Sequence, residues 1–297
     1  MTAPHTLDLG PLSGPVLCFG GPYSNAQATQ ALLAEAGRRG IPADRMICTG
    51  DVVAYGGDPA ACVDLIRAAR IPVVMGNCEE SLGFAADDCN CGFESGSDCA
   101  EWSAAWFANA AMALDDDARA WMRALPRRIR FEMAGRRFSV LHGGPDAISQ
   151  YIFASTPVAT KADIIGRLDV DAVIGGHSGL AFTQILGPRL WHNAGAIGMP
   201  ANDGTPRGWF SILTPDAATG AIQITLHGLD YDHAEAARAM RAVTPDLPYA
   251  ETLSSGLWPN MAVLPATERE QQGRPLGSRP VTWTPPARET ASAAAAE

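Results

Sequence analysis

Apolar positions follow two different periods along the first quarter of the chain. Residues 16–19 and 45–48 are short apolar runs, and each predicts a buried β-strand. Residues 26–38 and 59–70 instead repeat apolar side chains at helical spacing, and another short run at residues 71–75 predicts a third strand. Strands that alternate with helices in this way predict a mainly parallel sheet with helices on its faces.

Strand patterns dominate the chain from Arg128 onward. Before that point come a Gly-, Asp- and Cys-rich insertion at residues 83–98 and a helical region at residues 100–125. Turn residues at positions 186–188 and 218–220 predict two β-hairpins. We therefore expect a second, more antiparallel sheet that packs on the first. The later strands are predicted at residues 137–141, 172–174, 189–192, 209–213 and 221–227, with a helix at residues 160–168.

Composition narrows the classes of protein to which the chain can belong. Hydrophobic residues make up 47% of the 297 positions and charged residues 18%, as in a globular protein with a large core. The net charge of −10 excludes general nucleic-acid binding, which needs clustered Lys and Arg. Neither a signal peptide nor an apolar run of about 20 residues is present, so we expect a cytoplasmic protein without membrane contact. In that reducing compartment the seven cysteines are not expected to form structural disulfides.

The chain divides into one large domain and two smaller segments. Residues 1–250 form the main domain, and residues 83–125 are a cysteine-containing insertion within it. Residues 251–284 are a C-terminal extension whose apolar segment packs on the domain or on a neighbour, which predicts a homo-oligomer. The final residues, 285–297, are Ala-rich and are predicted to be disordered.

Polar side chains directly follow several of the predicted strands. Asp51 and Asn77 come after the second and third strands, and His142 and His177 follow two of the later ones. Since the carboxyl ends of parallel strands converge on one crevice, these side chains are expected to meet there. Each alone also has an ordinary explanation as a helix cap, a turn residue or a buried histidine. Together they predict a nitrogen and oxygen ligand shell for manganese, iron or zinc.

The motifs around these four residues resemble a known family. They are Gly50-Asp51, Gly76-Asn77-Cys78-Glu79, His142-Gly143 and Gly176-His177, in that order along the chain. In combination they resemble the calcineurin-like metallophosphoesterase superfamily, in particular its branch of small bacterial and archaeal phosphodiesterases and diadenosine-tetraphosphatase-like proteins. The resemblance spans residues 16–226. It implies a four-layer α/β/β/α sandwich of two mixed sheets and a metal-dependent phosphoesterase.

The resemblance also implies a particular set of metal ligands. Members of the superfamily hold two metals that share a bridging aspartate and a bridging hydroxide. The ligands of the first metal are expected where this chain has Gly21, Tyr23 and Gly179, none of which is the usual residue. One half of a two-metal site is therefore retained. The retained ligand positions are Asp51, Asn77, His142 and His177.

Three interpretations of this half-site stay open. In the first, one metal on the retained ligands supports phosphoester hydrolysis. In the second, another metal persists on new ligands, either Tyr23 or the insertion residues Cys89, Cys91 and Cys99. Those cysteines would otherwise form a redox-sensitive thiol set or a merely local loop. In the third, the fold is inactive and binds a phosphorylated ligand or a partner protein. The cofactor is thus expected to be one or two divalent transition-metal ions per chain.

Further residues are assigned to catalysis and to the substrate by the same resemblance. Cys78 stands where many relatives have a histidine near the leaving group, and Asn25 follows the opening motif. Asp203 and Arg207 lie where relatives place groups near the substrate, and the Arg guanidinium is a forked donor for phosphate. The predicted substrate is a small phosphorylated molecule, either a phosphodiester or a metabolite. The predicted catalytic residues are Asp51, Cys78 and Tyr23.

Overall fold

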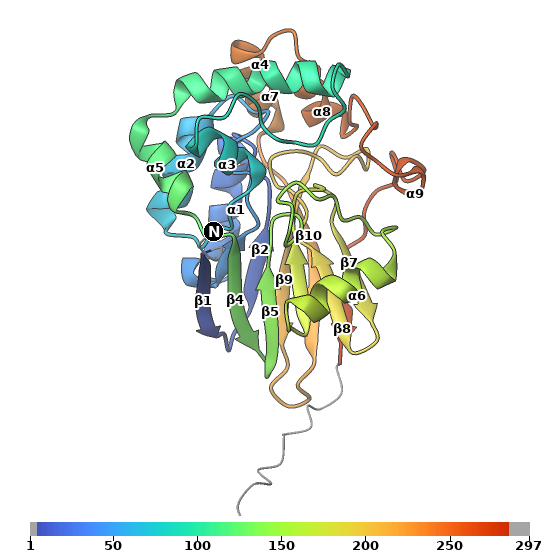
Figure 1. Ribbon diagram of the computed structural model, residues 1–297. Coiled ribbons are helices and arrows are strands. Elements are labelled where there is room, and N and C mark those ends of the chain that lie inside the picture. The colour runs from blue at the N-terminus through green and yellow to red at the C-terminus, as the bar shows by residue number, and fades with distance from the viewer. Residues whose placement is uncertain (1–4, 285–297) are drawn as a thin grey trace, which may run out of the picture.

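The computed structural model describes residues 5–284, which fold into two β-sheets enclosed by helices (Figure 1). The strands are β1 (Thr6–Pro11), β2 (Val16–Phe19), β3 (Met46–Cys48), β4 (Arg128–Met133), β5 (Arg136–Val140), β6 (Ala172–Gly175), β7 (Phe182–Leu186), β8 (Arg189–Asn193), β9 (Gly208–Pro215), β10 (Ile222–Leu229) and β11 (Val281–Trp283). The helices are α1 (Ala26–Arg38), the 3₁₀ turn η1 (Ala43–Arg45), α2 (Pro59–Ala69), α3 (Asn77–Gly83), α4 (Asp98–Ala113), α5 (Asp116–Ala124), α6 (Val158–Arg167), α7 (His233–Val243), α8 (Tyr249–Ser255) and α9 (Ala266–Arg269).

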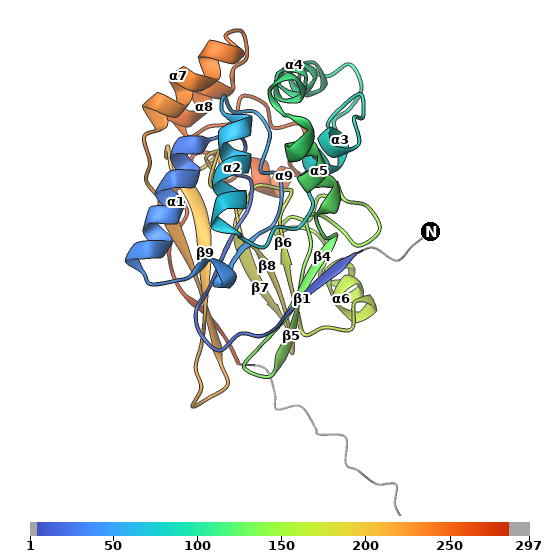
Figure 2. The same cartoon turned by 90° about the vertical axis from the view of Figure 1, so that its left-hand side faces the viewer.

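Both sheets are mixed. The strand order is β1-β4-β5-β6-β8-β7 in the sheet that we call sheet A, and β11-β10-β9-β2-β3 in sheet B. Strand β2 runs parallel to β3 and antiparallel to β9, whereas β5, β6 and β8 run parallel to one another. Figure 2 shows α1 and α2 outside sheet B and α6 outside sheet A. The chain therefore has the predicted architecture of two mixed sheets between layers of helices.

The position of strand β2 between two hydrophobic cores explains why its sequence is apolar at every position. Val16 and Cys18 contribute to the core between the two sheets, and Leu17 and Phe19 point the other way, into the core that includes Leu32 of α1. Successive side chains of a strand face opposite sides, so a strand covered on both faces needs no polar position. Burial of each such side chain contributes about 1.5–3 kcal/mol.

Two features of the predicted sheets are wrong. Strands β9 and β10 do not join the later strands but return to sheet B, where Leu213 lies opposite Val16. Residues 71–75 form no strand, because only Val73 bridges to Cys48 and the neighbouring Pro72 has no N–H for a ladder. Local periodicity reports that a segment is extended, and it carries no information on which strand becomes the neighbour.

The C-terminal extension packs on its own chain. Strand β11 pairs antiparallel with β10, placing Trp283 opposite Ile222, and the indole is buried in the core between the sheets. Nearer the start of the extension, the backbone N–H of Trp258 donates to the side-chain oxygen of Asn202 at 2.8 Å. The predicted homo-oligomer stays a prediction, and the predicted tail at residues 285–297 lies outside the described residues.

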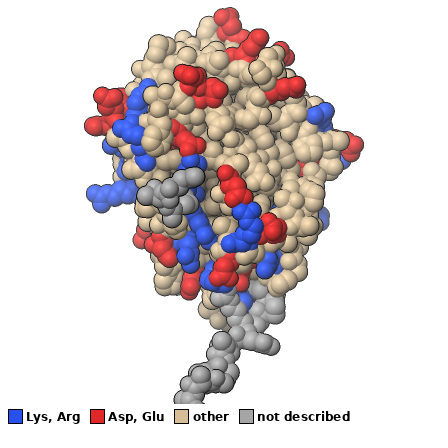
Figure 3. Space-filling model, in the orientation of Figure 1, with Lys and Arg blue, Asp and Glu red and all other residues tan. Residues whose placement is uncertain are grey.

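The distribution of charged side chains on the surface agrees with the absence of clustered Lys and Arg in the sequence. On the face drawn in Figure 3, the described Lys and Arg side chains are interspersed with Asp and Glu, and they form no broad basic area there. Within residues 5–284, no helix has both the length and the apolar character needed to cross a membrane.

Candidate metal centre

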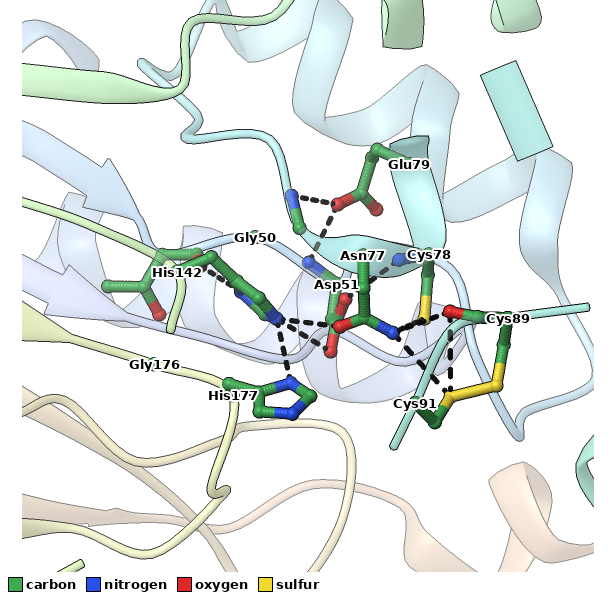
Figure 4. Close-up of polar contacts among 12 residues, drawn as sticks. Gly50, Asp51, Asn77, Cys78, Glu79, Cys89, Cys91, His142, Gly176 and His177 are labelled. Carbon is green, nitrogen blue, oxygen red and sulfur yellow. Dashed lines mark hydrogen bonds and ion pairs between the residues drawn. A yellow bond between two sulfur atoms is a disulfide. The ribbon is translucent and has the colours of Figure 1, made fainter. Parts of the chain in front are cut away.

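Four polar side chains meet at the carboxyl edge of the two sheets (Figure 4). Asp51 follows β3, Asn77 begins α3, and His142 and His177 follow β5 and β6. Asp51 and His177 adopt left-handed backbone conformations, with φ angles of 57° and 56°. Such conformations are uncommon for residues other than glycine and concentrate at functional sites. The structure thus brings together all four of the predicted metal ligands.

His142 lies at the centre of this cluster. Its Nδ1 is 2.6 Å from the carbonyl oxygen of Thr49, which can only accept, so Nδ1 carries a proton and donates. Its Nε2 lies 3.0 Å from Oδ1 of Asn77, 3.3 Å from Oδ2 of Asp51 and 3.1 Å from Nδ1 of His177. Two ligands that are each about 2.1 Å from one ion lie roughly 3.0–3.4 Å apart. The spacing and the donor types therefore fit a single divalent ion.

The insertion orients the amide of Asn77. The amide nitrogen donates to the carbonyl oxygen of Cys89 at 2.8 Å, and this turns the amide oxygen toward His142. Cys89 and Cys91 are joined by a disulfide, and the hydroxyl of Tyr151 donates to the carbonyl of Cys91 at 2.8 Å. The predicted cysteine insertion thus lies over the metal ligands and contacts one of them directly.

Glu79 links the loop that carries Asp51 to the loop that carries Asn77 through hydrogen bonds. Its carboxylate accepts from the backbone N–H groups of Asp51 at 2.8 Å, Val52 at 2.7 Å and Gly76 at 2.9 Å. Burial, followed by the charge of Asp51, raises the pKa of Glu79 to about 7. Sequence reasoning gave this residue no role of its own. Its position three residues after Gly76 lets it accept from the N-cap backbone N–H, which is the Glu half of a capping box, and a carboxylate at that position of the first helical turn was the available signal.

Electrostatics set the protonation states of the cluster. Burial alone would raise the pKa of Asp51, but the adjacent His142 and His177 outweigh it and lower that pKa. Burial would lower the pKa of His142, and the carboxylate of Asp51 outweighs it and raises that pKa. For His177, burial together with the neighbouring His142 lowers the pKa to about 3. At neutral pH the cluster therefore offers a carboxylate and a neutral imidazole, which are the forms that bind metals.

Tyr23 fills the region where the first-metal ligands were expected. A Cβ atom at Gly21 would lie 2.4 Å from its ring, and one at Gly179 would lie 3.6 Å from its hydroxyl oxygen. Burial and the nearby Asp51 raise the pKa of Tyr23 well above its usual range, so the phenol keeps its proton. A protonated phenol is a weak metal ligand, and the ring fills space between the two glycines.

The bonding and protonation of the cysteines differ from those expected of a metal-binding or catalytic thiol set. Cys89 and Cys91 form a disulfide where none was expected, so in this state neither sulfur offers a thiolate to a metal. Cys99 is buried, and burial raises its pKa. Burial, Asp51 and Glu79 raise the pKa of Cys78 well above its usual range, so this thiol is neutral. Within the described residues, Asp51, His142 and His177 are the one group of His, Cys, Asp and Glu side chains close enough together to share a metal ion, and Asn77 joins them through its oxygen.

The three predicted substrate-binding residues make contacts that stabilise the fold. Asn25 caps the N-terminus of α1 with its side-chain oxygen. Asp203 accepts a hydrogen bond from the backbone of Leu276 in the extension at 3.1 Å. The guanidinium of Arg207 lies over the ring of Trp209, 5.3 Å from its centroid. The structure does not bring these three side chains to the cavity that adjoins the metal ligands.

That cavity is lined largely by aromatic rings, and we call it the aromatic cavity. It adjoins His177 and is bounded by Tyr23 near the N-terminus, Trp102 of α4, Tyr249 of α8 and Trp258 of the extension. Its free volume is about 90 Å³. These rings come from segments that are distant in the sequence and carry no common spacing that would have linked them.

The two-sheet sandwich and the donor cluster at its edge define an α/β protein with a candidate metal site. The chain belongs to the calcineurin-like phosphoesterase superfamily, because the model of that superfamily's domain matches residues 24–217. This superfamily uses divalent metals, in agreement with the donor cluster.

Known proteins resemble the chain chiefly in fold. A crystal structure of a metallophosphoesterase from Sphaerobacter thermophilus covers 83% of this chain and all of its own, with 23% identity and a TM-score of 0.63. A hypothetical protein from Pyrococcus horikoshii covers 82% of this chain and 99% of its own, with 15% identity and a TM-score of 0.68. An uncharacterized protein from Methanocaldococcus jannaschii is 42% identical over 55 residues, which are 18% of this chain and 22% of that protein.

Proposed function

We propose that the chain is a metal-dependent phosphodiesterase with one divalent ion on Asp51, Asn77, His142 and His177. The observation that carries this proposal is the environment of Nε2 of His142. The carbonyl oxygen of Thr49 accepts a hydrogen bond from the other ring nitrogen, and Nε2 lies 3.0–3.3 Å from one ligand atom of each of the other three residues. A single divalent ion accounts for this spacing, because two ligand atoms that are each about 2.1 Å from one ion lie roughly 3.0–3.4 Å apart.

The chain's own residues prepare this site for phosphoester hydrolysis. A divalent metal there would supply polarisation of a phosphoryl oxygen and activation of water. Thr49 and Cys89 orient His142 and Asn77 through their carbonyl oxygens. With Nδ1 of His177 turned toward His142, the ring proton resides on Nε2, which is buried, and the backbone of Ser149 interacts with the ring.

Charge balance favours a diester over a monoester. The residues lining the aromatic cavity include no Lys, Arg, Asp or Glu. One divalent ion next to the carboxylate of Asp51 leaves a single positive charge to offset the substrate. A phosphodiester carries one negative charge at neutral pH, whereas a monoester carries close to two. Burying the second charge without a partner would oppose binding.

A second candidate function is ligand binding without catalysis. It is favoured by Tyr23, whose ring occupies the region between Gly21 and Gly179 and leaves no place there for the usual first metal. Retention of all four ligands of the other metal supports the catalytic candidate, which we therefore place first.

Metal content tests the proposal. We expect about one metal per chain by plasma mass spectrometry after manganese loading of the wild type, and its loss in His177→Ala. His227→Ala is the matched control, because His227 lies on β10 away from the site. The loaded wild type should hydrolyse bis(p-nitrophenyl) phosphate faster than p-nitrophenyl phosphate. Metal binding without hydrolysis would favour the second candidate, and a chain that binds no metal would overturn the proposed centre.

A further inference from the structure

The aromatic cavity has a composition unlike that of a phosphate site. Seven of its lining side chains are aromatic rings, those of Tyr23, Tyr55, Phe93, Trp102, Tyr151, Tyr249 and Trp258. None of its lining residues is Lys or Arg, and none is Asp or Glu. A nucleoside polyphosphate or a sugar phosphate would meet no compensating cation there. The cavity is therefore suited to an uncharged group.

The rings hold one another in place. Tyr55 lies with its centroid 5.1 Å from that of Tyr23 and 4.8 Å from that of Tyr249. Trp102 meets Tyr249 edge to face at 5.8 Å. Such tilted and edge-to-face arrangements are the favoured geometries of aromatic pairs, and each is worth roughly 0.5–1.5 kcal/mol beyond burial. The cavity is thus formed before a ligand enters, by segments that are distant in the sequence.

Trp258 closes the cavity from the C-terminal extension. Its indole N–H donates to the carbonyl of Pro200 at 2.7 Å, and its backbone N–H donates to Asn202. A Cβ atom at Gly179 would lie 3.6 Å from its ring, which is an ordinary van der Waals distance, so the indole packs closely over Gly179. The neighbouring Leu257 is 37% exposed and does not line the cavity. Trp258 and Leu257 thus form a matched pair for mutagenesis.

The cavity also continues into the candidate metal centre. His177 belongs to both, and the ring of Tyr151 lies 4.3 Å from the His177 ring at a tilt of 37°. A group in the cavity would therefore be adjacent to a phosphoryl group at the metal centre. The free volume of about 90 Å³ limits that group to a small one.

We propose that the aromatic cavity binds a small, uncharged aromatic ring that is esterified to the phosphate, so that the substrates are monoanionic aryl phosphodiesters. This assignment rests on the proposed phosphodiesterase function. In the reaction a water oxygen forms a new bond to phosphorus and the bond from phosphorus to the aryl oxygen breaks. One proton of the water passes to the departing aryl oxygen, which leaves as a phenol, and the other stays on the phosphate monoester.

Binding of phenol to the metal-free chain tests the cavity independently of catalysis. We expect saturation-transfer NMR to detect phenol on the wild type and on Leu257→Ala, with at least tenfold weaker binding to Trp258→Ala. Cyclohexanol, tetramethylammonium and inorganic phosphate should bind more weakly than phenol. Equal binding of cyclohexanol, preferred binding of tetramethylammonium or phosphate, or unchanged phenol binding by Trp258→Ala would overturn the assignment. Val263→Phe, which narrows the cavity from another side, replaces Trp258→Ala if that variant does not fold.

Kinetics then separate the two proposals. With metal loaded, Trp258→Ala should raise the KM for bis(p-nitrophenyl) phosphate about tenfold with a smaller change in kcat, and Leu257→Ala should change neither. Phenol binding without any hydrolysis would refute the phosphodiesterase and leave the cavity assignment standing as a binding site. Hydrolysis with the same KM in Trp258→Ala and the wild type would refute the cavity assignment and leave the phosphodiesterase standing.

Discussion

The side chain of Asn77 joins the metal cluster to Cys89 of the insertion, with its nitrogen 2.8 Å from the carbonyl oxygen of Cys89 and its oxygen 3.0 Å from Nε2 of His142. An amide can satisfy both contacts in only one orientation, and that orientation presents its oxygen to the metal centre. The position of the insertion and the geometry of a metal ligand are therefore coupled. Partners that orient ligands in this way commonly change metal affinity by about 10- to 100-fold when they are lost.

Opening the disulfide should therefore weaken metal binding. In a Cys89→Ser/Cys91→Ser variant the loop around residue 89 loses the link that closes it, and Asn77 loses its fixed partner. We expect the Kd for manganese, measured by competition with a chelator, to rise about tenfold. Cys99→Ser is the control, because Cys99 is not part of the disulfide. An unchanged Kd in the double variant would show that the loop does not orient the ligand.

Much of the fold was predictable because its local patterns are strong. The apolar run of β2 and the amphipathic α1 were predicted at their observed bounds, and the α2 prediction exceeded the helix by one residue. Edge strand β1 was not predicted, since its side chains are only partly buried and pair with β4 far along the chain. The pairing of β9 with β2 was also not predicted, because these two strands are far apart along the chain. Strand neighbours depend on contacts that are distant in the sequence and that no local period encodes.

The metal ligands were predictable for a different reason. Asp51, Asn77, His142 and His177 each follow a buried segment, and the topology of parallel strands brings such positions to one edge. No comparable topological rule predicts which side chains line the aromatic cavity. Trp258 reaches it through an extension that wraps back over the domain, held by a hydrogen bond to Pro200. That path is set by tertiary contacts, so the sequence alone offered no basis for placing Trp258 in the site.

Tyr23 and Gly21 are sterically coupled, and this predicts the outcome of rebuilding the missing ligands. A Cβ at Gly21 would lie 2.4 Å from the Tyr23 ring, and Gly21 has a φ angle of 45°. Gly21→Asp alone should therefore destabilise the fold by about 2 kcal/mol or more, measured by urea unfolding. Adding Tyr23→His replaces the phenol ring with the smaller imidazole and should recover part of that loss.

The triple variant Gly21→Asp/Tyr23→His/Gly179→His should then hold two metals per chain where the wild type holds one. Tyr23→His alone is the control, because it opens space without supplying the other two ligands. Plasma mass spectrometry gives the stoichiometry. A triple variant that still binds a single metal would mean that the surrounding loops, and not only these three side chains, have lost the first site.

His192 should make the fold sensitive to acid. The imidazole is fully buried, its ring nitrogens lie 3.0 Å from the hydroxyl oxygen of Thr183 and 2.7 Å from that of Ser211, and burial lowers its pKa from 6.5 to about 4. Between pH 6.5 and pH 4, His192 binds a proton in the unfolded chain but stays neutral in the folded chain. The free energy of unfolding should therefore fall as the pH drops from 6.5 to 4, by up to about 3 kcal/mol from this residue.

Urea unfolding of His192→Gln at several pH values checks this prediction. Glutamine lowers stability at pH 7 because it fits the two hydroxyl partners less well, but it cannot take up a proton. The stability difference between the wild type and His192→Gln should therefore shrink from pH 6.5 to pH 4 and stay constant above pH 7.5. His5→Gln, which changes an exposed histidine, should show no such convergence. Parallel pH profiles for the wild type and His192→Gln would mean that water or a rearrangement stabilises the charged imidazole inside the fold.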